Sequence, residues 1–136
     1  MPKKNKLDPV FALHDVGWLL LRGHKGEEAI DRLFQISLAP ELPPEWRRKL
    51  KTLTRQVRRI VSYDRKAREA VAEGNRTEAW RQIDLAEKVL GSAPLGLTVT
   101  FTGPAISGTE DLSHTVLKGA EAMVYDTRRF ARLRLH

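Results

Sequence analysis

Apolar residues recur at alternating intervals of four and three through the middle of the chain, from Trp46 to Val71. This spacing places them on one face of an α-helix, because residues three and four apart are neighbours on a helix surface. It predicts a helix from Glu45 to about Glu73, roughly 40 Å long. Asp64 is the polar interruption, where we expect a bend or an exposed end. The complete stripe is Trp46, Leu50, Leu53, Val57, Ile60, Asp64, Ala67 and Val71.

Three shorter helical patterns surround this long helix, over residues 9–22, 27–38 and 77–90. Asp8 followed by Pro9 is typical of a helix start, because Asp caps free amides and Pro is tolerated in the first turn. Short turns join the helices in pairs, which favours two antiparallel hairpins. The side chains expected to face inward are Phe11, Leu13, Trp18, Leu20 and Leu21, then Ala29, Ile30, Leu33, Phe34 and Ile36, then Ala79, Trp80, Ile83, Ala86 and Leu90.

The last third of the chain mixes two patterns. Leu97 to Thr102 alternates with period two and predicts a short strand, although the sequence offers no visible partner for it. Ser107 and Glu110 have the spacing of a capping box and predict the start of a final helix. Residues 128–135 fit either a continuation of that helix or a second strand, and we favour a helix to about Arg132.

These patterns predict a mainly α fold, a small helical bundle of two antiparallel hairpins plus a C-terminal helix. One short extended segment lies near residues 97–102. The 136 residues suffice for one domain of ordinary size. We expect a disordered basic leader at residues 1–7 and one domain at 8–136. Within it, residues 8–92 form a four-helix core, and 93–136 form the extended segment and the C-terminal helix with its basic tail.

Composition excludes several kinds of site. The chain has no cysteine, so disulfides, thiolate metal sites and cysteine nucleophiles are ruled out. The four histidines, at 14, 24, 114 and 136, show no metal-binding spacing, and we expect no metal, no cofactor and no enzymatic activity. We expect His14 to pack within the first helix. No apolar run approaches the roughly 20 residues of a membrane helix, and the basic N-terminus lacks the apolar core of a signal peptide. These features predict a cytoplasmic protein.

Positive charge is concentrated on the long central helix. The chain carries a net charge of +7, and the segment from Glu45 to Glu73 has ten basic and four acidic residues, a net of +6. Arginine suits phosphate because its planar guanidinium donates two hydrogen bonds at once. We predict nucleic-acid contacts from seven of these residues, called the basic ridge below: Arg48, Lys51, Arg55, Arg58, Arg59, Arg65 and Lys66.

A second basic group, called the C-terminal cluster below, comprises Arg128, Arg129, Arg132 and Arg134. The first three are further candidate contacts for nucleic acid. Cations in the last turns of a helix also complement its dipole, which is the structural alternative. Tyr63 and Tyr125 lie close to the two basic groups in sequence and can either stack on bases or belong to the core. The tryptophans at 18, 46 and 80 are expected in the core.

The charge pattern favours a non-enzymatic accessory protein that binds nucleic acid, with RNA or a ribonucleoprotein ahead of duplex DNA. Since no base-reading motif is present, we expect backbone contacts with little sequence specificity, and other protein subunits as further partners. Two alternatives stay open for the ridge. It can be a solvated face on which the aliphatic parts of the Lys and Arg side chains shield the core, or it can be a surface that binds an acidic protein.

Two local resemblances imply other functions. Residues 74–80, Gly-Asn-Arg-Thr-Glu-Ala-Trp, resemble the turn of a tetratricopeptide hairpin, which implies a protein-interaction adaptor. In such an adaptor the extended segment near 97–102 can dock on another sheet edge. Arg129 and His136 resemble the Arg and His of small HEPN-type ribonucleases, with Phe130 where that family has a polar residue. That resemblance implies RNA cleavage by Arg129 and His136.

Overall fold

The computed structural model describes residues 8–22, 25–105 and 107–135, and it confirms a mainly helical bundle with one short β segment. The predicted leader, His24 and His136 lie outside the described residues. The elements are α1 (Pro9–Leu21), α2 (Gly26–Ser37), α3 (Pro44–Ala72), α4 (Arg76–Leu90), β1 (Thr98–Phe101), β2 (Gly108–Asp111) and α5 (Leu112–Arg134).

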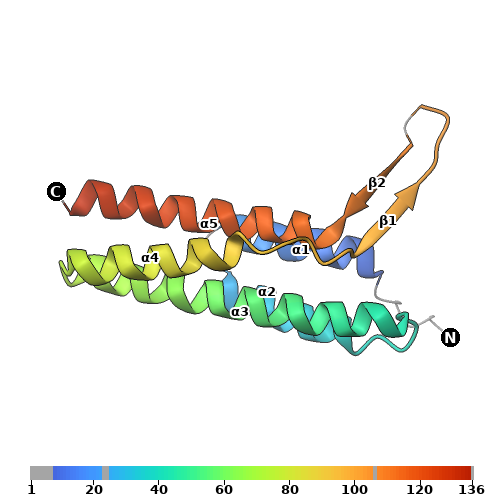
Figure 1. Ribbon diagram of the computed structural model, residues 1–136, viewed down its shortest axis with the longest axis horizontal. Helices are drawn as coiled ribbons and strands as arrows, with labels where there is room; N and C mark the ends of the chain where they lie inside the picture. Colours follow the sequence, from blue (N-terminus) through green and yellow to red (C-terminus); the bar gives the residue numbers. More distant parts are fainter. Residues whose placement is uncertain (1–7, 23–24, 106, 136) are drawn as a thin grey trace, which may run out of the picture.

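The bundle is built from two closely packed helix pairs, α3 with α4 and α1 with α5, which share its most extensive contacts (Figure 1). Helix α2 joins them by packing on both α1 and α3, and α5 also packs on α3 and α4. The C-terminal helix is therefore an integral member of the bundle and covers a face that the two predicted hairpins leave open.

The helix ends follow the sequence closely. Asp8 caps α1 by accepting a hydrogen bond from the Val10 N–H at 2.9 Å, and Asn75 caps α4 by accepting one from the Glu78 N–H at 3.2 Å. Gly74 supplies the left-handed backbone of the α3–α4 turn with φ +73°. The predicted helix boundaries are correct to within one residue at these ends.

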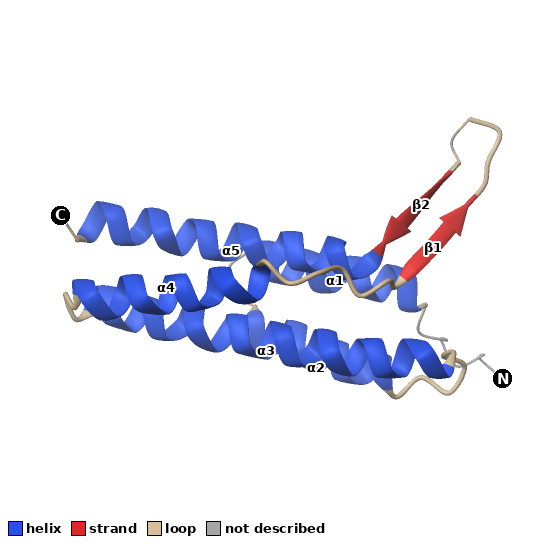
Figure 2. Ribbon diagram, in the orientation of Figure 1, coloured by secondary structure: helices blue, strands red, loops and turns tan. Residues whose placement is uncertain are grey.

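A β-hairpin projects from one end of the bundle (Figure 2). Strand β1 pairs antiparallel with β2, with Thr98 opposite Asp111 and Phe101 opposite Gly108. The prediction that Ser107 and Glu110 cap the last helix is therefore wrong, because residues 108–111 form the missing strand. Asp111 is the cap instead and accepts a hydrogen bond from the Ser113 N–H at 3.0 Å. The helical alternative for the tail is confirmed, since α5 runs to Arg134.

Asp64 lies in the core rather than at an exposed end. Its side chain is buried, accepts a hydrogen bond from the Thr127 hydroxyl of α5 and pairs with Arg68 Nε at 3.1 Å. The expectation of an exposed end is wrong because α5 covers this point of α3 and supplies a polar partner. Helix α3 continues beyond Asp64 to Ala72.

Several aromatic side chains predicted to face inward lie on the surface. Phe11, Trp18 and Phe34 are 71%, 59% and 59% exposed, and Leu21 is also exposed. Apolar residues extend around too much of α1 and α2 for all of them to be covered. Trp46 and Trp80 are only half-buried, packed against the core.

None of the helices in the described part of the chain combines the length and apolarity that a membrane crossing requires.

Candidate nucleic-acid interface

All seven residues of the basic ridge are exposed. They lie on the outer face of α3, because the apolar stripe and Asp64 turn the opposite face toward the core and α5. From Arg48 to Lys66 the ridge extends about 27 Å at 1.5 Å per residue. Lys51, Arg55 and Arg59 follow one another at successive turns, so the middle of the ridge carries the densest charge.

The three remaining basic residues of α3 bind within the protein. Arg47 Nη2 donates to the carbonyls of Ala39 and Pro40, and Lys49 Nζ donates to the Gly96 carbonyl at 3.0 Å. Arg68 pairs with Asp64. The helix therefore separates its cations into an internal set, which holds neighbouring loops and the core, and an external set.

Within the ridge, most cationic side chains make no hydrogen bond or ion pair with the part of the chain that the structure describes. Arg65 pairs with Glu27 at 3.3 Å, and since both side chains are exposed this ion pair is weak. Among the described residues, no hydrogen bond or ion pair joins Lys51, Arg55 or Arg58 to another side chain. These charges are available to an external anion.

Two grooves flank the ridge. The α3–α4 groove, of about 340 Å³, runs along one side and the α2–α3 groove, of about 470 Å³, along the other. Arg55 and Arg59 line both, and no described residue lining either groove is acidic. Cations gathered in a concave surface without acids raise the local concentration of a polyanion.

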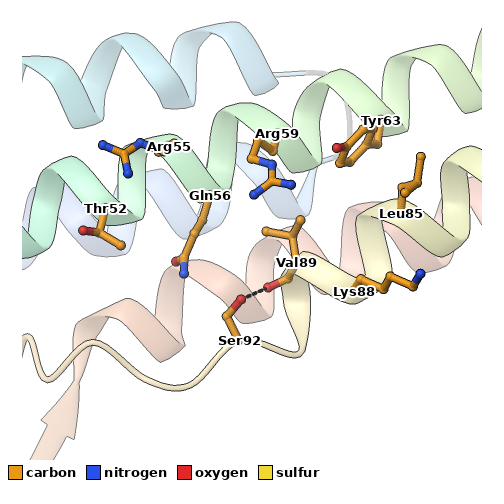
Figure 3. A pocket seen from close by; sticks show the side chains of 9 residues that line it. All are labelled: Thr52, Arg55, Gln56, Arg59, Tyr63, Leu85, Lys88, Val89 and Ser92. Atoms are coloured by element: carbon orange, nitrogen blue, oxygen red, sulfur yellow. Dashed lines mark hydrogen bonds between the residues drawn. The ribbon is translucent and has the colours of Figure 1, made fainter.

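The α3–α4 groove combines charged, amide and aromatic side chains (Figure 3). Arg59 and Gln56 extend from α3 toward α4, and Lys88 adds a further cation from α4. Gln56 Oε1 is buried without a hydrogen-bond partner in the described structure. Tyr63 lines this groove and is half-buried, so one of the two candidate tyrosines does lie beside the ridge. The other residues that line this groove are Thr52, Leu85, Val89 and Ser92.

The α2–α3 groove contains an aromatic residue that the helical pattern predicts to face the core. Phe34 lines it, together with Ser37 and Thr54 and the four ridge cations Lys51, Arg55, Arg58 and Arg59. The available signal was that Leu33 and Phe34 are adjacent and cannot both point at the same face of a helix. Leu33 is fully buried, which leaves Phe34 outside.

The C-terminal cluster does not join the ridge. Arg128 Nη2 pairs with Glu87 of α4 at 2.8 Å, and its guanidinium lies 5.7 Å from the centre of the Trp80 ring. Arg129 and Arg132 are exposed. Arg129 is two residues from Thr127, which faces α3, so it points away from α3 on the far side of α5. Tyr125 is 58% exposed on α5 and does not line either groove.

Other candidate chemistry is sparse. The described residues contain no group of three or more His, Cys, Asp or Glu side chains that could hold a metal ion. His14 lies within α1, where the sequence predicts it, and its partly exposed side chain places Nε2 3.5 Å from the Glu110 carboxylate of the hairpin. The Arg129–His136 pair cannot be placed, since His136 lies outside the described residues.

Comparison with known proteins gives no match, whether with family models, with curated proteins or with solved structures.

Proposed function

We propose that this protein is a non-enzymatic accessory protein that binds nucleic acid, RNA in preference to duplex DNA, through the basic ridge of α3. One observation carries the proposal: apart from Arg65, the exposed ridge cations make no hydrogen bond or ion pair with another described side chain, in a segment whose other three cations are all engaged. A surface built only for solubility needs no such separation, and it ordinarily interleaves both signs of charge.

The position of α3 supports backbone contact with little sequence specificity. Helices α2 and α4 both pack on α3, so it does not stand clear of the bundle. A recognition helix must enter the major groove of DNA to read base edges. A flanked helix meets phosphates instead, and phosphate contacts carry no sequence information.

Arg129 and Arg132 form a second, separate contact in this proposal. They lie on the far side of α5 from the ridge, so one straight strand cannot cover both groups. Arg128 does not contact nucleic acid in this proposal, because its guanidinium already pairs with Glu87 and lies over the Trp80 ring.

Two charge reversals of equal size test the proposal. The ridge variant is Arg55→Glu/Arg58→Glu/Arg59→Glu, and its matched control is Arg129→Glu/Arg132→Glu/Arg134→Glu. Fluorescence anisotropy with labelled RNA and duplex DNA is expected to show binding abolished by the ridge variant and only weakened by the control. Circular dichroism confirms that both fold. Equal losses, or no binding by the wild type at low salt, would contradict the proposal.

A second candidate is a protein-interaction role, which the exposed aromatic face of α1 favours. Phe11 and Trp18 are seven residues apart and lie on the same side of that helix, 71% and 59% exposed. A partner subunit covering this face would complete an accessory protein of a larger assembly. Phe11→Ser/Trp18→Ser is then expected to abolish co-purification with the native partner while RNA binding persists. Retained co-purification would contradict this role.

A further inference from the structure

Phe34 is an exposed aromatic ring set among cations. It belongs to α2, is 59% exposed, and lines the α2–α3 groove opposite Lys51, Arg55, Arg58 and Arg59 of α3. The core does not account for it, because Ala29, Leu33 and Ile36 supply the fully buried face of this helix. Single exposed apolar side chains are common on protein surfaces, but the place of this ring beside four positive charges favours a ligand that is both aromatic and anionic.

We propose that the α2–α3 groove binds a single-stranded segment of RNA, with one base stacked on Phe34 and the adjoining phosphates on Lys51, Arg55 and Arg58. This proposal rests on the proposed function and names its substrate class. Aromatic side chains beside a basic groove are how proteins bind single strands with little sequence preference, since every base has a π-face. In a duplex the base faces are covered by their neighbours, so Phe34 has nothing to stack on.

Two hydroxyls in the groove favour ribose over deoxyribose. Ser37 Oγ donates to the Phe34 carbonyl at 2.6 Å, and Thr54 Oγ1 donates to the Leu50 carbonyl at 2.7 Å. With their protons committed to the backbone, both oxygens remain acceptors. The ribose 2′-OH can donate a hydrogen bond to either oxygen. This hydroxyl is the group that distinguishes RNA from DNA.

The test compares Phe34→Leu with Phe34→Trp by anisotropy on unstructured single-stranded RNA and on an RNA duplex. Phe34→Leu keeps an apolar side chain without the ring and is expected to weaken single-strand binding about tenfold. Phe34→Trp is expected to retain it. Duplex binding stays within about twofold of the wild type for both, because the phosphate contacts are unchanged. The matched control is Phe11→Leu, at an exposed phenylalanine of α1 that does not line the groove.

The salt dependence separates stacking from charge. Phe34→Leu leaves the slope of log K against log salt unchanged, whereas Lys51→Ala lowers its magnitude by about 0.7. Normal single-strand binding by Phe34→Leu, with binding still lost in the arginine reversal, would overturn this inference and leave the proposed function standing. If both Phe34→Leu and the arginine reversal bound single-stranded RNA normally, this inference and the proposed function would both be overturned. Single-stranded DNA of the same sequence is expected to bind more weakly, and equal affinity would overturn the assignment to RNA.

Discussion

Gly119 of α5 lies directly against the backbone of Gly17 of α1: a Cβ at position 119 would stand 2.2 Å from the Gly17 carbonyl oxygen. The two helices therefore touch backbone to backbone, which only glycine permits. This contact determines which side of α1 is buried. Gly17, Val16 and Leu20 face inward, and the neighbouring Trp18 is left on the surface.

Gly119→Ala is expected to destabilise the bundle by at least about 2 kcal/mol, because the helices must separate to admit one methyl group. For a domain of this size that loss lowers Tm by about 6–10 °C. Thermal unfolding followed by far-UV circular dichroism measures it. Gly91→Ala is the matched control, since a Cβ there meets its nearest atom at 3.5 Å. Equal Tm values for the two variants would contradict the close contact.

Thr127→Val is expected to cost about 1–3 kcal/mol, because it removes the α5 hydroxyl that donates to the buried Asp64 carboxylate while preserving the side chain's shape. Chemical denaturation gives the free energy of unfolding. Thr52→Val serves as control, since that hydroxyl only bonds to the Arg48 carbonyl of its own helix, and a change within about 0.5 kcal/mol is expected there. A neutral effect at Thr127 would mean that Asp64 does not depend on α5.

Asp111 makes stability depend on pH. Burial raises its pKa, but hydrogen bonds from the Ser113 hydroxyl and from the Ser113 and Gly96 N–H groups outweigh burial, and the pKa lies below the ordinary 3.8. A carboxyl with a depressed folded pKa stabilises the protein fully above its unfolded pKa. The contribution is lost as pH falls through the folded pKa.

Asp111→Asn is therefore expected to be less stable than the wild type at neutral pH, by about 0.5–1 kcal/mol from the lost charge at the α5 N-terminus. The difference should shrink as pH falls below about 4. Unfolding curves across a pH series measure it, with Asp126→Asn as the control for removing an exposed negative charge. A difference that stays constant with pH would contradict the depressed pKa.

Arg128→Ala is expected to lower stability by about 1 kcal/mol, because it breaks the contacts with Glu87 and Trp80 that join α5 to α4. RNA affinity should stay within about twofold of the wild type. Arg129→Ala, at the exposed next position, is the matched control and should leave Tm unchanged. A large loss of RNA affinity without a change in Tm would return Arg128 to the set of binding residues.

Helix positions could be predicted from the sequence, because the stripe on α3 and the cap at Asp8 act within a few residues. The partner of β1 could not. The Thr109–Glu110 region has no strong strand pattern, and its pairing with β1 depends on a turn that brings residues 101 and 108 together.

The ridge was predictable for the same local reason: it lies opposite a regular apolar stripe. The burial and the partners of side chains that contact neighbouring helices could not be predicted in this way. The helical pattern predicts Phe34 in the core, but Leu33 occupies the buried position beside it. Arg128 was predicted to contact nucleic acid, but in the structure it pairs with Glu87 of α4. Asp64 looked like an interruption because its hydroxyl partner lies 63 residues further along the chain.

The measurement that tests the central claim most directly is the salt dependence of binding to single-stranded RNA. Contact with about five phosphates predicts a slope of log K against log salt near −3.5 for the wild type. Removing three contacts in Arg55→Ala/Arg58→Ala/Arg59→Ala should reduce it to about −1.4. A wild-type slope near zero, or the same slope in the triple variant, would contradict the claim that the α3 ridge binds phosphates.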